Sequence, residues 1–160
     1  MEEKISKGLQ DPEVIKSALA MKRIAVVGMS SKELRASHFV GFYLQRNGYE
    51  IIPVNPRESE ILGLKCYPNL LEVPGPVDVV DVFRESSAVP QIAEESVEIK
   101  ASFLWLQFGV ISQEGVTIAS SGGIKSVVDR CIKIEHARYM GRMHWLGFNT
   151  EQIKATRDKL

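Results

Sequence analysis

The sequence predicts an α/β fold: a Rossmann-like, doubly wound parallel sheet of five strands in a single domain. Short apolar runs rich in β-branched residues recur at intervals of about 20 to 30 residues, close to the length of a βαβ unit. Amphipathic helical stretches separate these runs. The runs are apolar throughout instead of alternating, which is typical of strands covered by helices on both faces. We therefore expect right-handed crossovers and the strand order 3-2-1-4-5.

The first expected element is a short helix. Asp11 stands where an N-cap would stand, Pro12 suits the first helical position, and the apolar residues that follow recur at helical spacing. The run RIAVVG from Arg23 to Gly28 is too short for a core helix and predicts a buried strand. A second helix is expected to begin after Ser37 as its N-cap and to end at Gly48.

The same alternation continues along the chain. Further strands are expected at YEIIPV and at residues 77–83, 102–108 and 126–128. Further helices are expected at residues 88–99 and at about 112–121. The predicted organisation is a helical lead-in over residues 1–22, the Rossmann-like domain over residues 23–138, and a C-terminal extension over residues 139–160 packed on the same domain.

Composition excludes several classes of protein. The 160 residues carry 20 basic and 20 acidic side chains, so the electrostatic footprint of a nucleic-acid-binding protein is absent. No apolar run approaches the roughly 20 residues of a membrane span, and the polar N-terminus is unlike a signal peptide. Cys66 and Cys131 suit neither a disulfide scaffold nor a zinc knuckle. We expect a cytoplasmic protein with reduced thiols and no nucleic-acid or membrane partner.

Ligands of open α/β sheets bind beyond the carboxyl ends of the strands, so the loops there are the candidate site. The loop after the first predicted strand contains Gly28, Ser30, Ser31, Lys32, Arg35 and Ser37 and leads into a helix. Hydroxyls, cations and a helix N-terminus favour an anion, which predicts a phosphate cradle. The loop matches neither the GxGxxG fingerprint nor a P-loop.

The end of the second predicted strand discriminates between nucleotide cofactors. An NAD site has a carboxylate there for the ribose hydroxyls, whereas this chain has Asn55, Pro56 and Arg57. The Arg57 guanidinium suits a phosphate. NADP and coenzyme A (CoA), which each carry an extra ribose phosphate, therefore fit better than NAD.

Several ordered motifs resemble a known family. VVGMSS, RASHFV, GYEIIPVNPRE, GLKCYPNLLEVP, VDVVDVFR, FLWLQFGV and VVDRCIKIEHAR together resemble the small stand-alone CoA-binding-domain proteins. These are similar to the N-terminal domain of the succinyl-CoA synthetase α subunit. The resemblance covers residues 23–138 and implies that CoA binds across the carboxyl edge of the sheet.

The resemblance also implies a role for each site residue. Those expected at the pyrophosphate are Gly28, Ser30, Arg35 and Ser37, with Ser31 beside them. Those expected against the adenosine are Val54, Asn55 and Pro56, and Arg57 would be available for the ribose phosphate. Those expected at the mouth through which the pantetheine arm leaves are Phe83, Arg84, Gln107 and Gly109.

Other residues are weaker candidates for chemistry. Arg130 could activate the Cys131 thiol, but no orienting carboxylate can be assigned to His136 as a base, so packing behind a strand end is the favoured interpretation. Cys131, His136 and His144 match no recurrent zinc spacing.

Carboxylates and aromatic residues also have structural interpretations. Asp78 and Asp81 lie three positions apart on a strand and should face opposite sides, with Asp81 a satisfied structural carboxylate. His38 should either touch a phosphate or face solvent. Three aromatic residues are expected in the core, namely Phe103, Trp105 and Phe108.

The leading functional hypothesis is a non-catalytic sensor, carrier or accessory module for CoA or an acyl-CoA. The alternative is a nucleotide-dependent enzyme, either an NADP-type oxidoreductase or an acyl-CoA ligase component that needs a partner subunit. Succinyl-CoA synthetase uses a phosphorylated histidine in a second domain, so ligase activity of this chain alone is not expected. A third class, a regulatory protein that senses cofactor through a homo-oligomer or a protein partner, is compatible with the same site.

Overall fold

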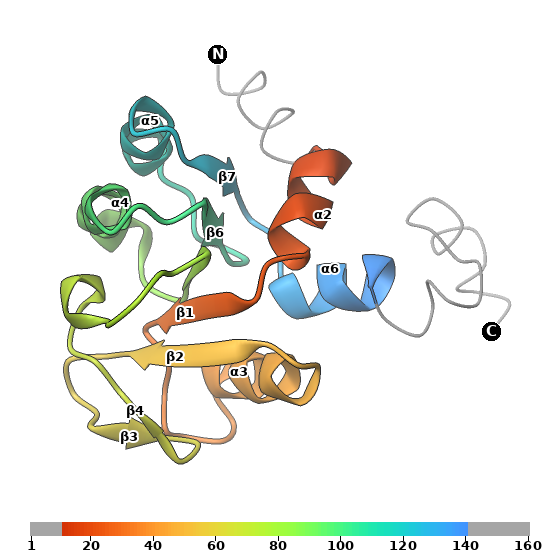
Figure 1. Cartoon of the computed structure of the whole chain (residues 1–160), viewed down its shortest axis with the longest axis vertical. Coiled ribbons are helices and arrows are strands. Elements are labelled where there is room, and N and C mark those ends of the chain that lie inside the picture. Colours follow the sequence, from red (N-terminus) through yellow and green to blue (C-terminus); the bar gives the residue numbers. More distant parts are fainter. Residues whose placement is uncertain (1–10, 141–160) are drawn as a thin grey trace, which may run out of the picture.

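The computed structural model describes residues 11–140, which form a five-stranded parallel sheet with helices on both faces (Figure 1). The strands are β1 (Arg23–Val27), β2 (Glu50–Val54), β5 (Val79–Val82), β6 (Phe103–Leu106) and β7 (Lys125–Val127). All neighbours in the order β2-β1-β5-β6-β7 pair in parallel. The predicted fold class is confirmed, and all five strands lie where the apolar runs predict them.

The strand order is consistent with the Rossmann-like pattern 3-2-1-4-5, with one correction to its assignment. The place beside β2 belongs to an isolated parallel bridge between Tyr67 and Val54. β5 is the third of the five apolar runs along the chain, so the predicted order puts it beside β2. It pairs with β1 instead and therefore takes position 4 of the pattern. Position 3 of the pattern is occupied only by this bridge. Because no apolar run marks the bridge, the hydrophobic pattern of the sequence could not reveal it.

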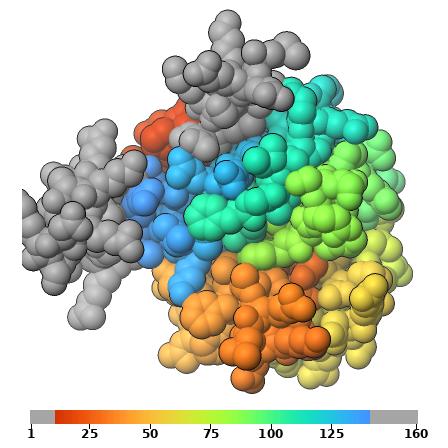
Figure 2. Space-filling model, turned by 180° about the vertical axis from the view of Figure 1, so that it is seen from behind, coloured from red at the N-terminus to blue at the C-terminus, as the bar shows by residue number. Residues whose placement is uncertain are grey.

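Helices cover both faces of the sheet. On one face, α4 (Val89–Glu98) and α5 (Gln113–Ser121) pack on a core that includes Ala25, Val80 and Leu104. On the other face lie α2 (Pro12–Leu19), α3 (Ala36–Arg46) and α6 (Ile132–Tyr139). Figure 2 views the molecule from behind, with α3 in orange and α6 in blue. Each strand alternates between the two cores, because successive side chains point to opposite faces.

The lead-in helix forms as its pattern predicts. The Asp11 carboxylate accepts a hydrogen bond from the Glu13 N–H at 2.9 Å, and Pro12 occupies the first turn. Ile15 and Leu19 are buried against the sheet. The predicted boundaries at residues 1–22 and 139–160 stay a prediction, because residues 1–10 and 141–160 lie outside the described part of the chain.

Several small elements fall within predicted connections. Strands β3 (Glu60–Ile61) and β4 (Leu64–Lys65) form an antiparallel hairpin after β2. The 3₁₀ turns η1 (Leu70–Glu72) and η2 (Ser86–Ala88) precede β5 and α4. Helix α6 follows β7 after a short turn and was not predicted as a separate element. No helix among residues 11–140 is long and apolar enough to cross a bilayer.

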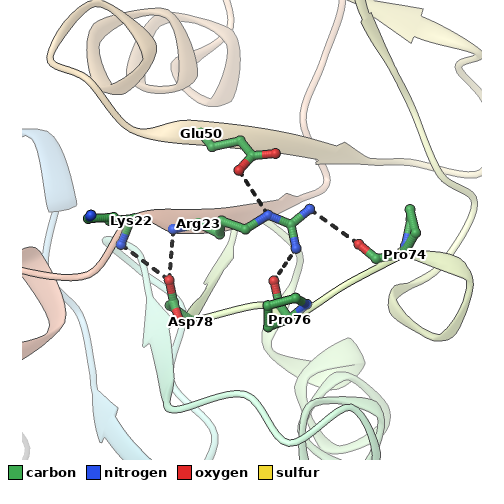
Figure 3. A network of polar contacts seen from close by, with 6 residues as sticks. All are labelled: Lys22, Arg23, Glu50, Pro74, Pro76 and Asp78. Carbon is green, nitrogen blue, oxygen red and sulfur yellow. Dashed lines mark hydrogen bonds and ion pairs between the residues drawn. The ribbon is translucent and has the colours of Figure 1, made fainter.

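A polar network closes the amino edge of the sheet (Figure 3). The Arg23 guanidinium donates to the carbonyls of Pro74 and Pro76 and pairs with the Glu50 carboxylate at 3.0 Å. The Asp78 carboxylate accepts the backbone N–H of Arg23 at 2.9 Å. These contacts hold the starts of β1, β2 and β5 together, at the edge opposite to the candidate site.

Two predicted core aromatics are buried and one is not. Phe103 and Trp105 lie in the core, whereas Phe108 is 60% exposed. The prediction for Phe108 was wrong because this residue follows the end of β6, on a loop at the carboxyl edge of the sheet.

Candidate functional site

Two hollows open at the carboxyl edge of the sheet. The larger has a volume of about 520 Å³ and lies over the ends of β1, β2 and β5. Its lining consists of Gly28, Ser30, Lys32, Arg35, Ala36, Ser37, Asn55, Arg57, Glu58 and Phe83. The structure therefore brings together seven of the residues that the sequence analysis assigns to the site.

The smaller hollow, of about 220 Å³, lies directly beside the larger one. Its lining consists of Val27, Val54, Pro56, Pro68, Asn69, Leu70, Arg84, Ala88, Gln91, Ile92 and Glu95. Four separate pairs of chain neighbours each give one residue to each hollow: Val27 and Gly28, Val54 and Asn55, Pro56 and Arg57, and Arg84 and Phe83. One elongated ligand could therefore occupy both hollows.

Gly28 allows the first loop to pass close to β5. Its φ is +85°, and a Cβ at this position would stand 2.6 Å from the Phe83 carbonyl oxygen. The Gly28 N–H donates to the Val54 carbonyl at 2.8 Å. Only glycine combines this left-handed conformation with so close an approach. The loop thus leaves β1 between the ends of β2 and β5, where strand order reverses.

Ser37 holds the first loop instead of capping the helix. Helix α3 begins at Ala36, with Arg35 as its N-cap residue, so the prediction of Ser37 as N-cap was wrong. The buried Ser37 hydroxyl accepts the Ser30 N–H at 3.0 Å. The Arg35 side chain makes no capping hydrogen bond, and Ala36 and Ser37 of the first turn of α3 line the larger hollow.

Further bonds shape the same loop. The Ser30 hydroxyl accepts the Lys32 N–H at 3.1 Å, and the His38 Nδ1 lies 2.9 Å from the Ser30 carbonyl oxygen. His38 therefore contacts the loop backbone, which neither of its two predicted roles describes. Ser31 is exposed and donates its hydroxyl to the Glu58 carboxylate at 2.8 Å. It lies beside the larger hollow without lining it.

The second loop is tied to the first through Asn55. Its side-chain amide donates to the Met29 carbonyl at 2.9 Å, and its Oδ1 accepts the Arg57 N–H at 2.9 Å. This turn holds the Arg57 backbone at the larger hollow and leaves its side chain exposed. Cys66 is buried behind the turn, and its thiol lies 3.5 Å from the Asn55 carbonyl oxygen. Burial raises the pKa of the Cys66 thiol.

The charges around the larger hollow favour an anion. Lys32, Arg35 and Arg57 line it, against the single carboxylate of Glu58. All three cations are exposed. Together with the helix N-terminus, this set suits phosphate groups that keep partial contact with water. The arrangement can bind and orient a phosphorylated ligand.

The smaller hollow has apolar walls with a few polar groups. Glu95 accepts the Leu70 N–H at 3.2 Å, and burial raises the pKa of its carboxyl. Arg84 forms an ion pair with the exposed Glu85. The hydrogen bond from Arg84 lowers the pKa of the Glu85 carboxyl. Pro68, Asn69 and Glu95 were missed as site residues. Pro68 and Asn69 lie in the motif GLKCYPNLLEVP, so the segment, though not the role of these residues, was visible in the sequence.

Gln107 and Gly109 line neither hollow. Gln107 is 5% exposed, and its Oε1 accepts the Ile132 N–H at 3.0 Å, where α6 begins. The Gly109 N–H donates to the Asp129 carboxylate at 2.8 Å. Both residues lie at the end of β6, one strand beyond Phe83. Their role at the mouth through which the pantetheine arm would leave stays a prediction.

The other candidates take structural places. Cys131 is half-buried and packs at the edge of the core, as its structural interpretation predicts. His136 is hydrogen-bonded to the Tyr43 hydroxyl at 2.9 Å, and burial lowers the pKa of its imidazole. Within residues 11–140, no cluster of ligands could hold a metal ion. His144 lies outside the described residues.

Asp81 differs from its prediction. It is fully buried in β5, as expected, but neither carboxylate oxygen has a hydrogen-bond partner. Burial raises the pKa of this carboxyl well above its ordinary value, which favours the neutral acid. Asp78, outside the strand, accepts backbone N–H groups at the opposite edge.

Comparison with known proteins identifies the family. The model of the CoA binding domain matches residues 22–137. This chain belongs to the CoA-binding domain family. The resemblance seen in the sequence motifs is thus confirmed. The similar proteins are of two kinds, short proteins and much longer ligases.

The short relatives match most of their own length. The uncharacterized protein YneT of Bacillus subtilis is 46% identical over 116 residues, covering 72% of this chain and 86% of that protein. The structure of a hypothetical protein from Pyrococcus horikoshii superimposes with a TM-score of 0.79 at 36% identity, covering 81% of this chain and 92% of the other.

The longer relatives are CoA ligases. The ADP-forming acetate–CoA ligase I of Archaeoglobus fulgidus is 30% identical over 121 residues, and this chain spans 18% of its length. An acetyl-coenzyme A synthetase from Ca. Korarchaeum cryptofilum has a TM-score of 0.62 at 26% identity, with 27% of that chain covered. The family domain therefore also occurs as a small part of larger enzymes.

Proposed function

We propose that this protein binds CoA or an acyl-CoA at the carboxyl edge of its sheet and acts in the cytoplasm as a non-catalytic sensor, carrier or accessory module. The observation that carries the proposal is the pair of adjoining hollows, one with mainly apolar walls and one lined by three cations. CoA has the matching parts, an adenine ring next to a charged diphosphate and ribose phosphate. Membership of the CoA-binding domain family supports the same ligand.

The two hollows suggest which part of CoA each would hold. The adenosine suits the smaller one, where Val54, Pro56 and Pro68 offer flat apolar walls. The diphosphate suits the larger one, with Gly28, Ser30, Ser31, Arg35 and Ser37 of the first loop around it. Asn55, predicted against the adenosine, lines the larger hollow and shapes the turn between the two.

Arg57 and the β5 end complete the assignment. Arg57 is exposed beside Pro56, so its guanidinium is available for the 3′-phosphate of the ribose. The pantetheine arm would leave past Phe83 and Arg84 toward Gln107 and Gly109. This path follows the order of the strands from β5 to β6.

A ligase component is the second candidate function. The similarity to acetate–CoA ligases favours it, because this chain matches one part of those enzymes. In that case the chain would present CoA to catalytic groups on a partner subunit. Formation of acyl-CoA from a free acid, CoA and ATP, with release of ADP and phosphate, would then appear only when the partner is added, whereas a sensor or carrier would bind CoA alone.

Isothermal titration calorimetry tests the proposal. The protein, freed of ligand retained from expression, is titrated with CoA, dephospho-CoA, NAD and NADP. We expect micromolar or tighter binding of CoA, weaker binding of dephospho-CoA and little response to NAD or NADP. Binding of NADP without CoA would overturn the proposal in favour of a reductase.

A further inference from the structure

Two exposed apolar side chains stand on the loop that follows β6. Phe108 is 60% exposed and Ile111 is 59% exposed, although Val110 between them is buried. Single apolar residues are ordinary on a protein surface, but a pair on one loop beside a ligand site indicates a contact surface. Neither residue lines the two hollows described above.

The backbone of this loop is held from both sides. The Gly109 N–H donates to the Asp129 carboxylate at 2.8 Å, and the Ile111 N–H donates to the Ser86 hydroxyl at 3.0 Å. Buried Val110 anchors the middle of the loop. The two apolar side chains therefore stand on a fixed backbone. A ligand that contacts them need not order the loop, so the entropic cost of binding is small.

The loop lies next to the larger hollow along the edge of the sheet. β6 is the neighbour of β5, whose end carries Phe83 of the hollow lining, and the Gln107 N–H donates to the Val82 carbonyl. With a strand spacing near 4.8 Å, the end of β6 lies about 10 Å from the end of β1. In Figure 2 light-green atoms lie directly above the orange segment that includes α3, and teal atoms lie beyond them.

We infer that Phe108 and Ile111 contact the acyl chain of the bound ligand, so that the preferred ligand is an acyl-CoA with an uncharged aliphatic chain of several carbons. This inference rests on the proposed CoA site. The acyl group is the part of the ligand furthest from the diphosphate, and a ligand that leaves the larger hollow toward β6 reaches this loop last.

The local charge favours an uncharged acyl group. The Asp129 carboxylate lies within the same loop cluster, bonded to Gly109 between the two apolar residues. A second carboxylate on the acyl chain would be repelled by it. A succinyl group should therefore bind less well than a butyryl group of the same carbon number.

The test is a titration series with CoA, acetyl-, butyryl-, hexanoyl-, octanoyl- and succinyl-CoA. For the wild-type protein we expect affinity to rise about fourfold for each methylene that becomes fully buried. Octanoyl-CoA should bind at least about tenfold tighter than CoA. In the double variant Phe108→Ser with Ile111→Ser, the ratio of octanoyl-CoA to CoA affinity should fall to near one. Phe42→Ser, which removes an exposed aromatic from the middle of α3, should keep the wild-type ratio.

The outcomes separate the inference from the proposed function. CoA binding with no gain from the acyl chain overturns the inference alone, as does a gain that survives the double substitution. Failure of every thioester and of CoA itself overturns the proposed function as well. A ligand-free dimer in gel filtration that the double variant converts to a monomer would assign the pair to a second copy of the chain and also overturn the inference.

Discussion

The Ser37 hydroxyl accepts a hydrogen bond at 3.0 Å from the backbone N–H of Ser30, seven positions earlier in the chain. Both residues line the larger hollow, and Ser37 is buried in the first turn of α3. The shape of the proposed phosphate cradle thus depends on a buried side chain of this helix. This contact connects the start of α3 with the ligand site.

Replacing Ser37 by alanine should loosen the cradle without unfolding the protein. The lost bond is worth about 1 kcal/mol of unfolding free energy, and CoA affinity should fall roughly fivefold because the loop is no longer held. Urea unfolding and calorimetric titration measure the two effects. Ser17→Ala, which removes an exposed helical hydroxyl, is the matched control and should change neither. Unchanged CoA affinity in Ser37→Ala would remove this role.

Arg57→Ala should discriminate between CoA and dephospho-CoA. A charge-assisted bond to the 3′-phosphate is worth about 1.5 to 3 kcal/mol, which corresponds to a loss of roughly 10- to 100-fold in CoA affinity. Dephospho-CoA lacks this phosphate and should be affected little. The exposed Arg46, at the far end of α3, supplies the control variant Arg46→Ala. An equal loss for both ligands would show that Arg57 acts elsewhere.

Gly28→Ala should be more destabilising than Gly48→Ala. Both glycines have φ near +90°, but only at Gly28 would the new Cβ meet an atom, the Phe83 carbonyl oxygen at 2.6 Å. The conformational cost of about 1 to 2 kcal/mol is common to both variants. Chemical denaturation of the pair therefore isolates the cost of the clash, and equal destabilisation would contradict the close approach at Gly28.

Asp81→Asn should change how stability depends on pH. The buried carboxyl has a raised pKa, so the folded state keeps its proton while the unfolded state loses it above the ordinary value of 3.8. The contribution of Asp81 to stability therefore falls as pH rises above that value. The gain in unfolding free energy from Asp81→Asn should be larger at pH 7 than at pH 4. A pH-independent difference between the two proteins would refute this.

Most of the architecture could be predicted because it depends on local pattern. The five strands are short apolar runs, and α2 carries its cap and first-turn proline in the sequence. The hairpin β3–β4 was missed because two-residue strands have no periodicity, and its turn depends on the positive φ of Leu62 and Gly63. The pairing of β5 with β1 depends on tertiary packing, which no local sequence pattern predicts.

The candidate site was predictable as a set of segments but not as a set of contacts. Gly28, Arg35 and Arg57 meet in the larger hollow because parallel strands end at one edge. The bond from Ser30 to Ser37 and the exposure of Phe108 depend on how separate elements pack. The orphaned carboxyl of Asp81 could not be foreseen either, since polar groups in a core usually have partners.

A crystal structure of the protein saturated with CoA tests the central claim most directly. We predict the adenine ring against Pro56 and Pro68 in the smaller hollow, and the diphosphate in the larger hollow within hydrogen-bond distance of Ser30 and Arg35. CoA bound at another surface, or both hollows empty at saturating CoA, would contradict the account.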